Sequence, residues 1–518
     1  MKSAILQRHG TRISVLLGFH LVWVYVLWWS VAVHGLGTSR DSVEYLFTSL
    51  SVTRGEGFVS FLGEPYVLWP PLYPLLLSLV QTAAGIDPLQ AALVLQLITF
   101  MWIAILTAWL FSRLFQRNFA LAFIGNALVG TGVALTWLFQ AVGSDYLFIA
   151  LTLSLVYLCD VYINKNRLGT VWLIALVSAL AMLQRYIGIT VLFTGVWIVF
   201  RYSRTPVWEK LKRCSLLGFS VIPIGIWVSS LPVEAIVRDD PSSLFENIHW
   251  FTFSILSWFF PEAGLYGHPI RLQFGMWCLW LGVLAGGLVV WKFRRKPQDG
   301  SSIESSLYLF GVIYTILLLA IASLSSFNSL DSRFVSPVYV PLVVLSLKTM
   351  ETILSFEFGK VRFMQTAFRA VAYVLLLVVL SLSGFRSVTA VNLHRQTGWG
   401  YTSVDWGNNQ VIAYWLEHKP GGEYLAFSNY PAGVAVHTWH AVLSSPRRTA
   451  HPNVGEAVIP LDAYLPSLFE PGKDSYVIWM EPNEYTHVYT VDDLRGIVNV
   501  ETVYESVDGG IYRVLPLK

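Results

Sequence analysis

Charged residues are scarce in this chain. Only 13% of its 518 residues are Asp, Glu, Lys or Arg, and 55% are hydrophobic. A soluble domain carries about 25% charged residues, and the mean hydropathy here is +0.56. This composition excludes an ordinary soluble enzyme and a disordered chain, and it predicts a polytopic membrane protein.

Cysteine is scarce as well. The three cysteines lie in or beside the apolar part of the chain, and none follows residue 386. A disulfide framework and a Cys-x-x-Cys metal site are therefore excluded from the C-terminal tail. The tail also contains no nucleotide-binding glycine loop, no His-Glu-x-x-His motif and no convincing catalytic triad.

The charges that are present divide the chain in two. Residues 1–386 hold 27 Lys and Arg against 18 Asp and Glu, and residues 387–518 hold 8 against 14, which gives +9 (27−18) and −6 (8−14). The basic residues lie in short loops between apolar runs, so they do not indicate nucleic-acid binding. We predict a transmembrane catalytic domain at 1–386 and an external soluble domain at 387–518.

About eleven apolar segments are long enough to cross a bilayer. The first has about 20 apolar residues, which exceeds the roughly 7–15 of a cleaved signal peptide. A further segment, 69–85, is short and begins with prolines, which break helices beyond the first turn. The predicted spans are 13–33, 88–112, 119–141, 145–162, 169–183, 187–201, 214–231, 271–291, 306–325, 334–352 and 367–386.

Loop charge predicts the orientation. If segment 69–85 does not cross, 20 of the 27 Lys and Arg residues of the first domain fall on one side and 7 on the other. The positive-inside rule then places the N-terminus in the cytoplasm. The loops 34–87 and 232–270 and the whole tail are external, as expected for a multi-pass protein of the plasma (inner) membrane with an external or periplasmic C-terminal domain.

The tail alternates short β-rich runs with helical stretches, which predicts a small α/β domain. The expected helices are 408–418, 432–440 and 492–497, and the expected strands are 424–428, 441–443, 476–480, 498–504 and 511–515.

The first external loop begins with an amphipathic helix at 38–50. We expect Val43, Leu46, Phe47 and Leu50 to face the membrane, with Asp41, Glu44, Tyr45 and Thr48 on the opposite side. Ionisable groups retained at a membrane face indicate function. Thr38-x-x-Asp41 also fits a capping box, which remains an alternative role for Asp41.

Gly55 and Gly57 end this helix, and Pro70-Pro71-x-Tyr73-Pro74 opens the next apolar segment. This ordered combination resembles the GT-C glycosyltransferases, the integral-membrane enzymes that take a sugar from a polyprenyl phosphate. The branch that it resembles contains the aminoarabinose transferases of lipid A, the protein O-mannosyltransferases and many bacterial relatives. The resemblance covers residues 1–386 in architecture and 38–77 in motif.

The resemblance implies further site residues. Asp145 begins a span at the outer face, where the family has a second acid. Arg185 lies in an Arg-Tyr-x-Gly turn, and Arg333 begins the family's Arg-aromatic-x-x-Pro pattern. Helix capping by Asp145 and snorkelling of the two arginines to headgroups remain alternatives.

Two positions depart from the family. Ser42 follows Asp41 where many relatives have a second acid, and Trp69 precedes the two prolines where many have His. We therefore predict no metal site from Asp41, Glu44 and Asp145, which are widely spaced. A divalent cation remains possible, and no other cofactor is expected.

The implied reaction moves a sugar from a polyprenyl-phosphate donor to a hydroxyl of a lipid, glycan or protein acceptor, with inversion. Asp41 is the expected base, and Glu44 and Asp145 position the acceptor or tune the base. Arg185 and Arg333 bind the donor phosphate. The expected contacts to sugar or lipid, with packing as the alternative, are Tyr45, Tyr66, Trp69 and Tyr73.

The external loop 232–270 is rich in Phe and Trp between residues 250 and 260, and we expect an interfacial lid there.

Two other functions stay open. A transporter or flippase of a lipid-linked sugar would line a path near mid-span with polar groups, and a non-catalytic anchor would only display the tail.

Overall fold

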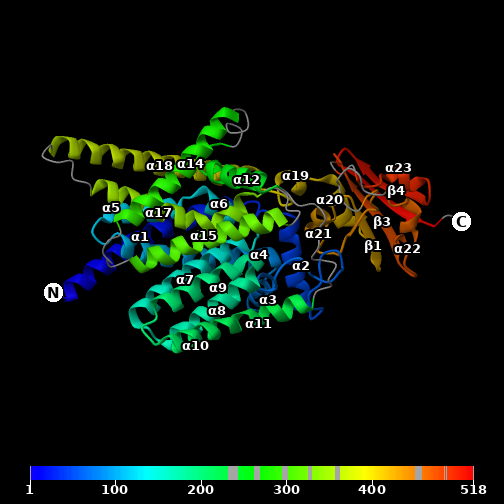
Figure 1. Cartoon of the computed structure of the whole chain (residues 1–518). Helices are drawn as coiled ribbons and strands as arrows, with labels where there is room; N and C mark the ends of the chain where they lie inside the picture. Colours follow the sequence, from blue (N-terminus) through cyan, green and yellow to red (C-terminus); the bar gives the residue numbers. More distant parts are fainter. Residues whose placement is uncertain are drawn as a thin grey trace.

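The computed structural model describes residues 2–230, 243–261, 269–293, 301–324, 330–355, 362–449, 458–483, 485 and 487–516. A bundle of apolar helices is followed at one end by a small sheet domain (Figure 1). The N-terminus lies at the end of the bundle that points away from the sheet domain, and the C-terminus lies beyond the sheet (Figure 1).

The bundle makes the chain an integral membrane protein. Eight helical segments of the described residues are long and apolar enough to cross a membrane, and four shorter apolar helices lie at Leu72–Ala84, Leu168–Gln184, Tyr186–Tyr202 and Gly275–Leu284. The eight long segments and the last three of the shorter helices overlap the eleven predicted spans, and Leu72–Ala84 falls in the segment 69–85 that we predicted not to cross. The bundle helices are α1 (Lys2–Val31), α4 (Pro88–Leu114), α5 (Phe119–Gly130), α6 (Val133–Gln140), α7 (Asp145–Lys165), α8 (Leu168–Gln184), α9 (Ile189–Tyr202), α10 (Val207–Gly218), α11 (Ile222–Ser229), α14 (Pro269–Phe293), α15 (Ser301–Leu324), α16 (Ser332–Val335), α17 (Tyr339–Leu354) and α18 (Arg362–Thr397).

The predicted span at 119–141 is divided into α5 and α6. The break lies at Thr131 and Gly132, where a Cβ on the glycine would lie 2.6 Å from the ring of Tyr339. The Tyr339 hydroxyl donates to the carbonyl of Leu128 at 2.7 Å. The backbone therefore passes so close to α17 that only glycine fits, and α6 after this break supplies residues to the cavity described below.

Helix α18 extends beyond the predicted domain boundary at 387 and ends at Thr397. Gly398 follows with φ +65°, a left-handed conformation that glycine adopts readily. The last turn of α18 and the turn after it thus connect the bundle directly to the sheet domain (Figure 1).

Three helices come from the segments predicted to be external loops: α2 (Arg40–Arg54), α3 (Leu72–Ala84) and α12 (Leu244–Ser257). The expectation of an interfacial lid at residues 250–260 is wrong. Phe251 and Ile255 of α12, and Trp258 just after the helix, are buried in the protein core. Ser254 also donates to the carbonyl of Leu330 at 2.9 Å. The remainder of the expected lid loop, residues 231–242 and 262–268, lies outside the described residues.

The C-terminal domain has the predicted α/β character. Its five strands have the order β2-β1-β3-β5-β4, with β1 parallel to β2 and β3, and β5 antiparallel to β3 and β4. The elements are α19 (Val404–Gly407), α20 (Gln410–His418), β1 (Tyr424–Ser428), α21 (Pro431–Thr438), β2 (Leu443–Ser444), α22 (Leu465–Leu468), β3 (Asp474–Met480), α23 (Val491–Arg495), β4 (Asn499–Ser506) and β5 (Gly509–Leu515).

The sheet domain contacts the bundle through the first external loop. Thr38 accepts a hydrogen bond from the amide of Tyr401 at 2.9 Å, and Phe61 accepts one from Val442 at 3.1 Å. Between these two points Phe47 of α2 stacks on Trp439 after α21, with ring centroids 5.7 Å apart. Helix α2 is therefore fixed by the soluble domain as well as by the bundle.

Candidate active site

Helix α2 carries the first acid of the site. Ser39 is its N-cap: the amide of Ser42 donates to the Ser39 hydroxyl, and the amide of Ser39 donates to the Ser42 hydroxyl at 3.0 Å. The alternative role of Asp41 in a capping box with Thr38 is therefore wrong, since the helix begins one residue later. Because two serines already cap the helix, the Asp41 carboxylate is available for another role.

The face of α2 that we expected to meet lipid meets protein instead. Val43 and Leu46 are fully buried, and Phe47 is covered by Trp439 of the sheet domain, while Leu50 is partly exposed. The correction has a simple reason. An amphipathic pattern indicates that one face is covered, but it does not distinguish lipid from a domain that folds over the helix.

Arg333 brings the acids together. It lies on the short helix α16, whose N-cap Asp331 accepts from the amides of Arg333 and Phe334. The guanidinium donates from Nη2 to Oδ2 of Asp41 at 2.8 Å, and its Nε lies 3.9 Å from Oδ2 of Asp145. The Arg333 and Asp41 side chains are each 28% exposed, so this ion pair is accessible.

Arg185 pairs with the other side of Asp145. This second pair is more deeply buried, with side-chain exposures of 11% and 4%.

The turn that presents Arg185 requires Gly188, because a Cβ there would lie 2.2 Å from the carbonyl oxygen of Ala181. Gln184 holds the start of α7 by donating to the carbonyl of Ser144 at 2.8 Å. Segments far apart in sequence thus form one connected cluster of Asp41, Arg333, Asp145 and Arg185.

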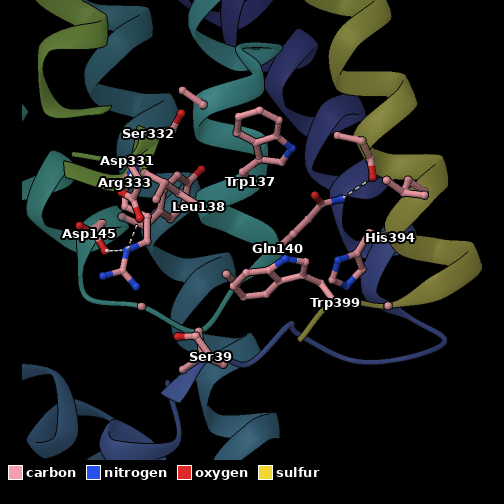
Figure 2. A pocket seen from close by; sticks show the side chains of 18 of the residues that line it. Ser39, Trp137, Leu138, Gln140, Asp145, Asp331, Ser332, Arg333, His394 and Trp399 are labelled. Atoms are coloured by element: carbon pink, nitrogen blue, oxygen red, sulfur yellow. Dashed lines mark hydrogen bonds and ion pairs between the residues drawn. The ribbon is translucent and has the colours of Figure 1, made fainter. Parts of the chain in front are cut away.

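The cluster lies at the edge of a cavity of about 600 Å³. Asp145, Asp331 and Arg333 line it directly, whereas Asp41 and Arg185 reach it through their ion pairs. Figure 2 shows these charged side chains on one side of the cavity and Trp137, Gln140, His394 and Trp399 on the other. Apolar side chains of α6 and α18 complete the lining.

Glu44 does not belong to the lining of this cavity. It is 6% exposed, and its Oε2 has no hydrogen-bond partner among the described residues. Burial raises the pKa of the Glu44 carboxyl to about 7, an effect that the nearby Arg40 partly opposes. Glu44 therefore differs from Asp41 in surroundings, although both lie on α2.

Three of the four expected aromatic contacts pack together beside the cluster, while Tyr66 packs on Phe58 and Trp227. Tyr45 and Tyr73 meet edge to face with centroids 5.1 Å apart, and Trp69 lies 6.4 Å from Tyr45. Tyr45, Tyr66 and Tyr73 are buried, and none of the four aromatic residues is part of the cavity lining. Tyr45 also exchanges a hydrogen bond with Ser144 at 3.2 Å. This arrangement supports the packing alternative for these residues.

Sequence reasoning missed four uncharged residues of the cavity lining in particular, Trp137, Gln140, His394 and Trp399. Asp331 was visible only as part of the motif around Arg333. The one available signal was the Gly398-Trp399-Gly400 triplet, in which both glycines have positive φ. No group of three or more His, Cys, Asp or Glu side chains suited to a metal occurs within the described ranges.

Solved structures share this architecture. Two structures of ArnT from Cupriavidus metallidurans, one bound to undecaprenyl phosphate and one in the apo state, match with TM-scores of 0.60 and 0.59. Sequence identity is 12% and 13%, and each match covers 96% of this chain and 97% of ArnT. The chain has the GT-C fold.

The GT-C fold extends to larger relatives. Arabinofuranosyltransferase AftD from Mycobacteria matches with a TM-score of 0.52 and 11% identity, over 97% of this chain but only 40% of AftD. No protein-family model matches the sequence, and no curated protein matches it. The similarity therefore lies in the fold.

Proposed function

We propose that this GT-C protein is a glycosyltransferase that moves a sugar from a polyprenyl-phosphate donor to an acceptor hydroxyl, with inversion. The observation that carries the proposal is the cluster of Asp41, Arg333, Asp145 and Arg185 at the edge of a cavity. Undecaprenyl phosphate is the ligand bound to ArnT in one of the matching structures, which supports a lipid phosphate as the donor group.

The charges of the cluster suggest how the donor enters. Two arginines face three aspartates, Asp41, Asp145 and Asp331, so no positive charge is in surplus. A donor phosphate therefore has to displace a carboxylate from an arginine. The accessible pair of Asp41 and Arg333 is the easier one to open. Phosphate binding to Arg333 would then release Asp41 at the moment when a base is needed.

The transfer needs one base and one anion site. The acceptor hydroxyl gives its proton to Asp41, and its oxygen forms a bond to the anomeric carbon. The bond from this carbon to the phosphate oxygen breaks, and its electron pair leaves with the lipid phosphate, held by Arg333 and Arg185 through charge-assisted hydrogen bonds. A single displacement inverts the anomeric centre, and a positioned base contributes about 10²–10⁴-fold.

Asp145 and Glu44 have supporting roles in this scheme. Asp145 sits between the two arginines and sets their positions. Glu44 lies outside the cavity lining, so we place it as a neighbour that tunes the charge around Asp41. A transporter would need ionisable groups along a path through the bundle, whereas this cluster lies at the end that carries the sheet domain.

We infer that the cluster and the sheet domain are external. The basic loops predicted to be cytoplasmic include the connection between α7 and α8 and the helix α10, and both lie at the end of the bundle away from the sheet domain (Figure 1). In a cysteine-free background, a membrane-impermeant thiol reagent should label Glu417→Cys in intact cells and miss Lys165→Cys. Labelling of Lys165→Cys alone would show that the orientation is the reverse of the one we infer.

The function is tested by transfer from undecaprenyl-phosphate sugars in nanodiscs. Wild-type protein should form product, Asp41→Asn should form little at any donor concentration, and Arg333→Ala should form less than wild type at low donor concentration. Asp331→Asn removes the same charge as Asp41→Asn from the cluster, and Asn still caps a helix, so its loss should be smaller. Equal losses in both aspartate variants would indicate a general charge effect and remove the reason to assign Asp41 as the base.

A further inference from the structure

The side of the cavity opposite the charged cluster is formed by polar and aromatic groups without charge. We call Gln140, His394 and Trp399 the neutral wall. They come from the end of α6, the last turn of α18 and the turn after it (Figure 2). The proposed mechanism uses none of them.

His394 has a fixed orientation. Its Nε2 lies 2.9 Å from the carbonyl oxygen of Gly35. A carbonyl only accepts hydrogen bonds, so Nε2 carries the proton. In the neutral ring this leaves Nδ1 as an acceptor, and Nδ1 has no partner among the described residues. The ring is buried in the protein yet forms part of the cavity lining.

Gln140 presents a second acceptor. Its amide nitrogen donates to the hydroxyl of Ser30 at 3.1 Å and to the carbonyl of Ala390 at 3.4 Å. These two bonds fix the side chain so that the nitrogen faces away, and Oε1 has no hydrogen-bond partner within the described part of the chain. The neutral wall thus combines two acceptors whose donors are already used elsewhere.

Trp399 supplies a flat apolar surface next to these acceptors. The glycines on either side, Gly398 and Gly400, have φ of +65° and +62°. The ring lies against Gly37, where a Cβ would approach Cε3 of the indole to 2.5 Å. Gly37 is itself held by hydrogen bonds to Gln140 and Val142. About half of the indole remains exposed.

Two fixed acceptors beside an indole face suit a ligand with hydroxyl donors and a ring of C–H groups, which describes a sugar. We propose that the neutral wall binds the sugar ring of the donor and determines which sugar is accepted. This inference rests on the proposed function and deepens it, because it assigns the part of the cavity that the charged cluster leaves open.

The covalent bond between sugar and phosphate in the proposed donor favours the donor sugar over other ligands of the neutral wall. In the proposed donor the sugar is bonded directly to the phosphate, so its ring must lie beside the group that holds the phosphate. Arg333 and the neutral wall line the same cavity of about 600 Å³ from opposite sides. A site that hydrogen-bonds substrate hydroxyls discriminates strongly, because an analogue without them leaves buried polar groups unpaired.

The test compares binding of undecaprenyl phosphate with binding of undecaprenyl phosphoryl-glucose, -mannose and -arabinose to the full chain in nanodiscs. Wild type should bind at least one sugar-bearing lipid about tenfold more tightly than the bare lipid phosphate. Trp399→Leu and His394→Gln should each remove most of this preference while changing the affinity for undecaprenyl phosphate less than about twofold. Arg333→Ala should weaken all four ligands.

His394→Gln has a matched control. Gln places its amide nitrogen where Nε2 was and keeps the bond to Gly35, but it loses the acceptor at Nδ1. His394→Asn places its carbonyl near Nδ1, so it should retain more of the preference for the sugar-bearing lipid. If Asn and Gln behave alike and both weaken undecaprenyl phosphate, His394 is structural.

The outcomes separate the two proposals. Equal loss of affinity for bare and sugar-bearing lipids, or an effect confined to the KM of the acceptor, would overturn the assignment of the neutral wall while leaving the transferase in place. A sugar preference that depends on Trp399, without transfer by any variant or by wild type, would instead support the wall and refute the transferase.

Discussion

The two sides of the cavity differ in the way they could be found. The charged side contains Asp41, Asp145, Arg185 and Arg333. Asp41 was identifiable as an ionisable group retained at a membrane face, and the other three followed from the resemblance to the GT-C family. The neutral wall consists of Gln140 and His394 at helix ends and Trp399 in a turn, and no charge or motif marks these residues in the sequence. In a membrane protein the charged part of a site is therefore visible in the sequence, whereas its uncharged part becomes visible only in three dimensions.

The largest effect is expected from Asp41→Asn. Turnover should fall by about 10²-fold or more, because Asn cannot accept the hydroxyl proton. Thermal stability should change little, since Ser39 and Ser42 form the cap of α2. Turnover and melting temperature measured in the same nanodisc preparation separate a base from a cap. Retained turnover with a lowered melting temperature would assign Asp41 a structural role only.

Arg185→Ala should affect folding more than Arg333→Ala. It leaves Asp145, 4% exposed, without its nearest partner, and breaking a buried ion pair costs about 3–5 kcal/mol. The double variant Arg185→Ala with Asp145→Asn should recover stability without recovering turnover. If the single variant melts like wild type, the pair is more hydrated than its burial indicates.

Arg333→Ala should act mainly on the donor. It removes a charge-assisted hydrogen bond worth about 1.5–3 kcal/mol, so the KM for the lipid-phosphate donor should rise about tenfold to a hundredfold. Lys at this position keeps the charge but lacks the fork that spans Asp41 and Asp145, and an intermediate value is expected. A change confined to the acceptor KM would place the phosphate elsewhere.

Gly37→Ala tests the contribution of the neutral wall. The added methyl group would displace Trp399, and such overpacking costs about 1–3 kcal/mol. We expect a weaker preference for sugar-bearing lipid with unchanged binding of undecaprenyl phosphate. Gly35→Ala is no suitable control, because Gly35 has a positive φ of 74°. Gly169, which has no neighbour within 4 Å of an added Cβ, offers a matched substitution.

Much of the fold was accessible from the sequence because hydropathy and periodicity are local signals. The apolar segments and the strands of the tail lie where they were predicted, with β1 at Tyr424–Ser428. What covers a surface is not a local property. For this reason the apolar faces of α2 and α12 were assigned to the membrane, although the sheet domain covers one and neighbouring helices cover the other.

The residues of the site also divide into those that a local pattern predicts and those that it does not. The ion pairs join residues as far apart as Asp41 and Arg333, and only loop charge placed them at the same end of the bundle. The neutral wall depends on which nitrogen of His394 is already bonded and on how closely Trp399 approaches Gly37. Neither property leaves a pattern in a single sequence.

The smallest effect on turnover is expected from Glu44→Gln, and it tests whether two acids on one helix have different tasks. Glu44 is buried away from the cavity lining, and burial raises the pKa of its carboxyl from 4.5 to about 7. The folded state therefore holds this proton more tightly than the unfolded state. The resulting stability is fully present below about pH 4.5 and is lost as the pH rises through about 7.

Gln keeps the shape of the protonated Glu44 side chain and cannot ionise. The melting temperature of the variant, compared with that of wild type, should therefore rise between pH 5 and pH 8, while turnover near pH 6 stays close to wild type. Asp41→Asn should show the reverse, with low turnover at every pH and no such trend in stability. If Glu44→Gln abolished turnover across this range, the catalytic acid of α2 would be Glu44, and the ion pair of Asp41 with Arg333 would serve only to hold the helix in place.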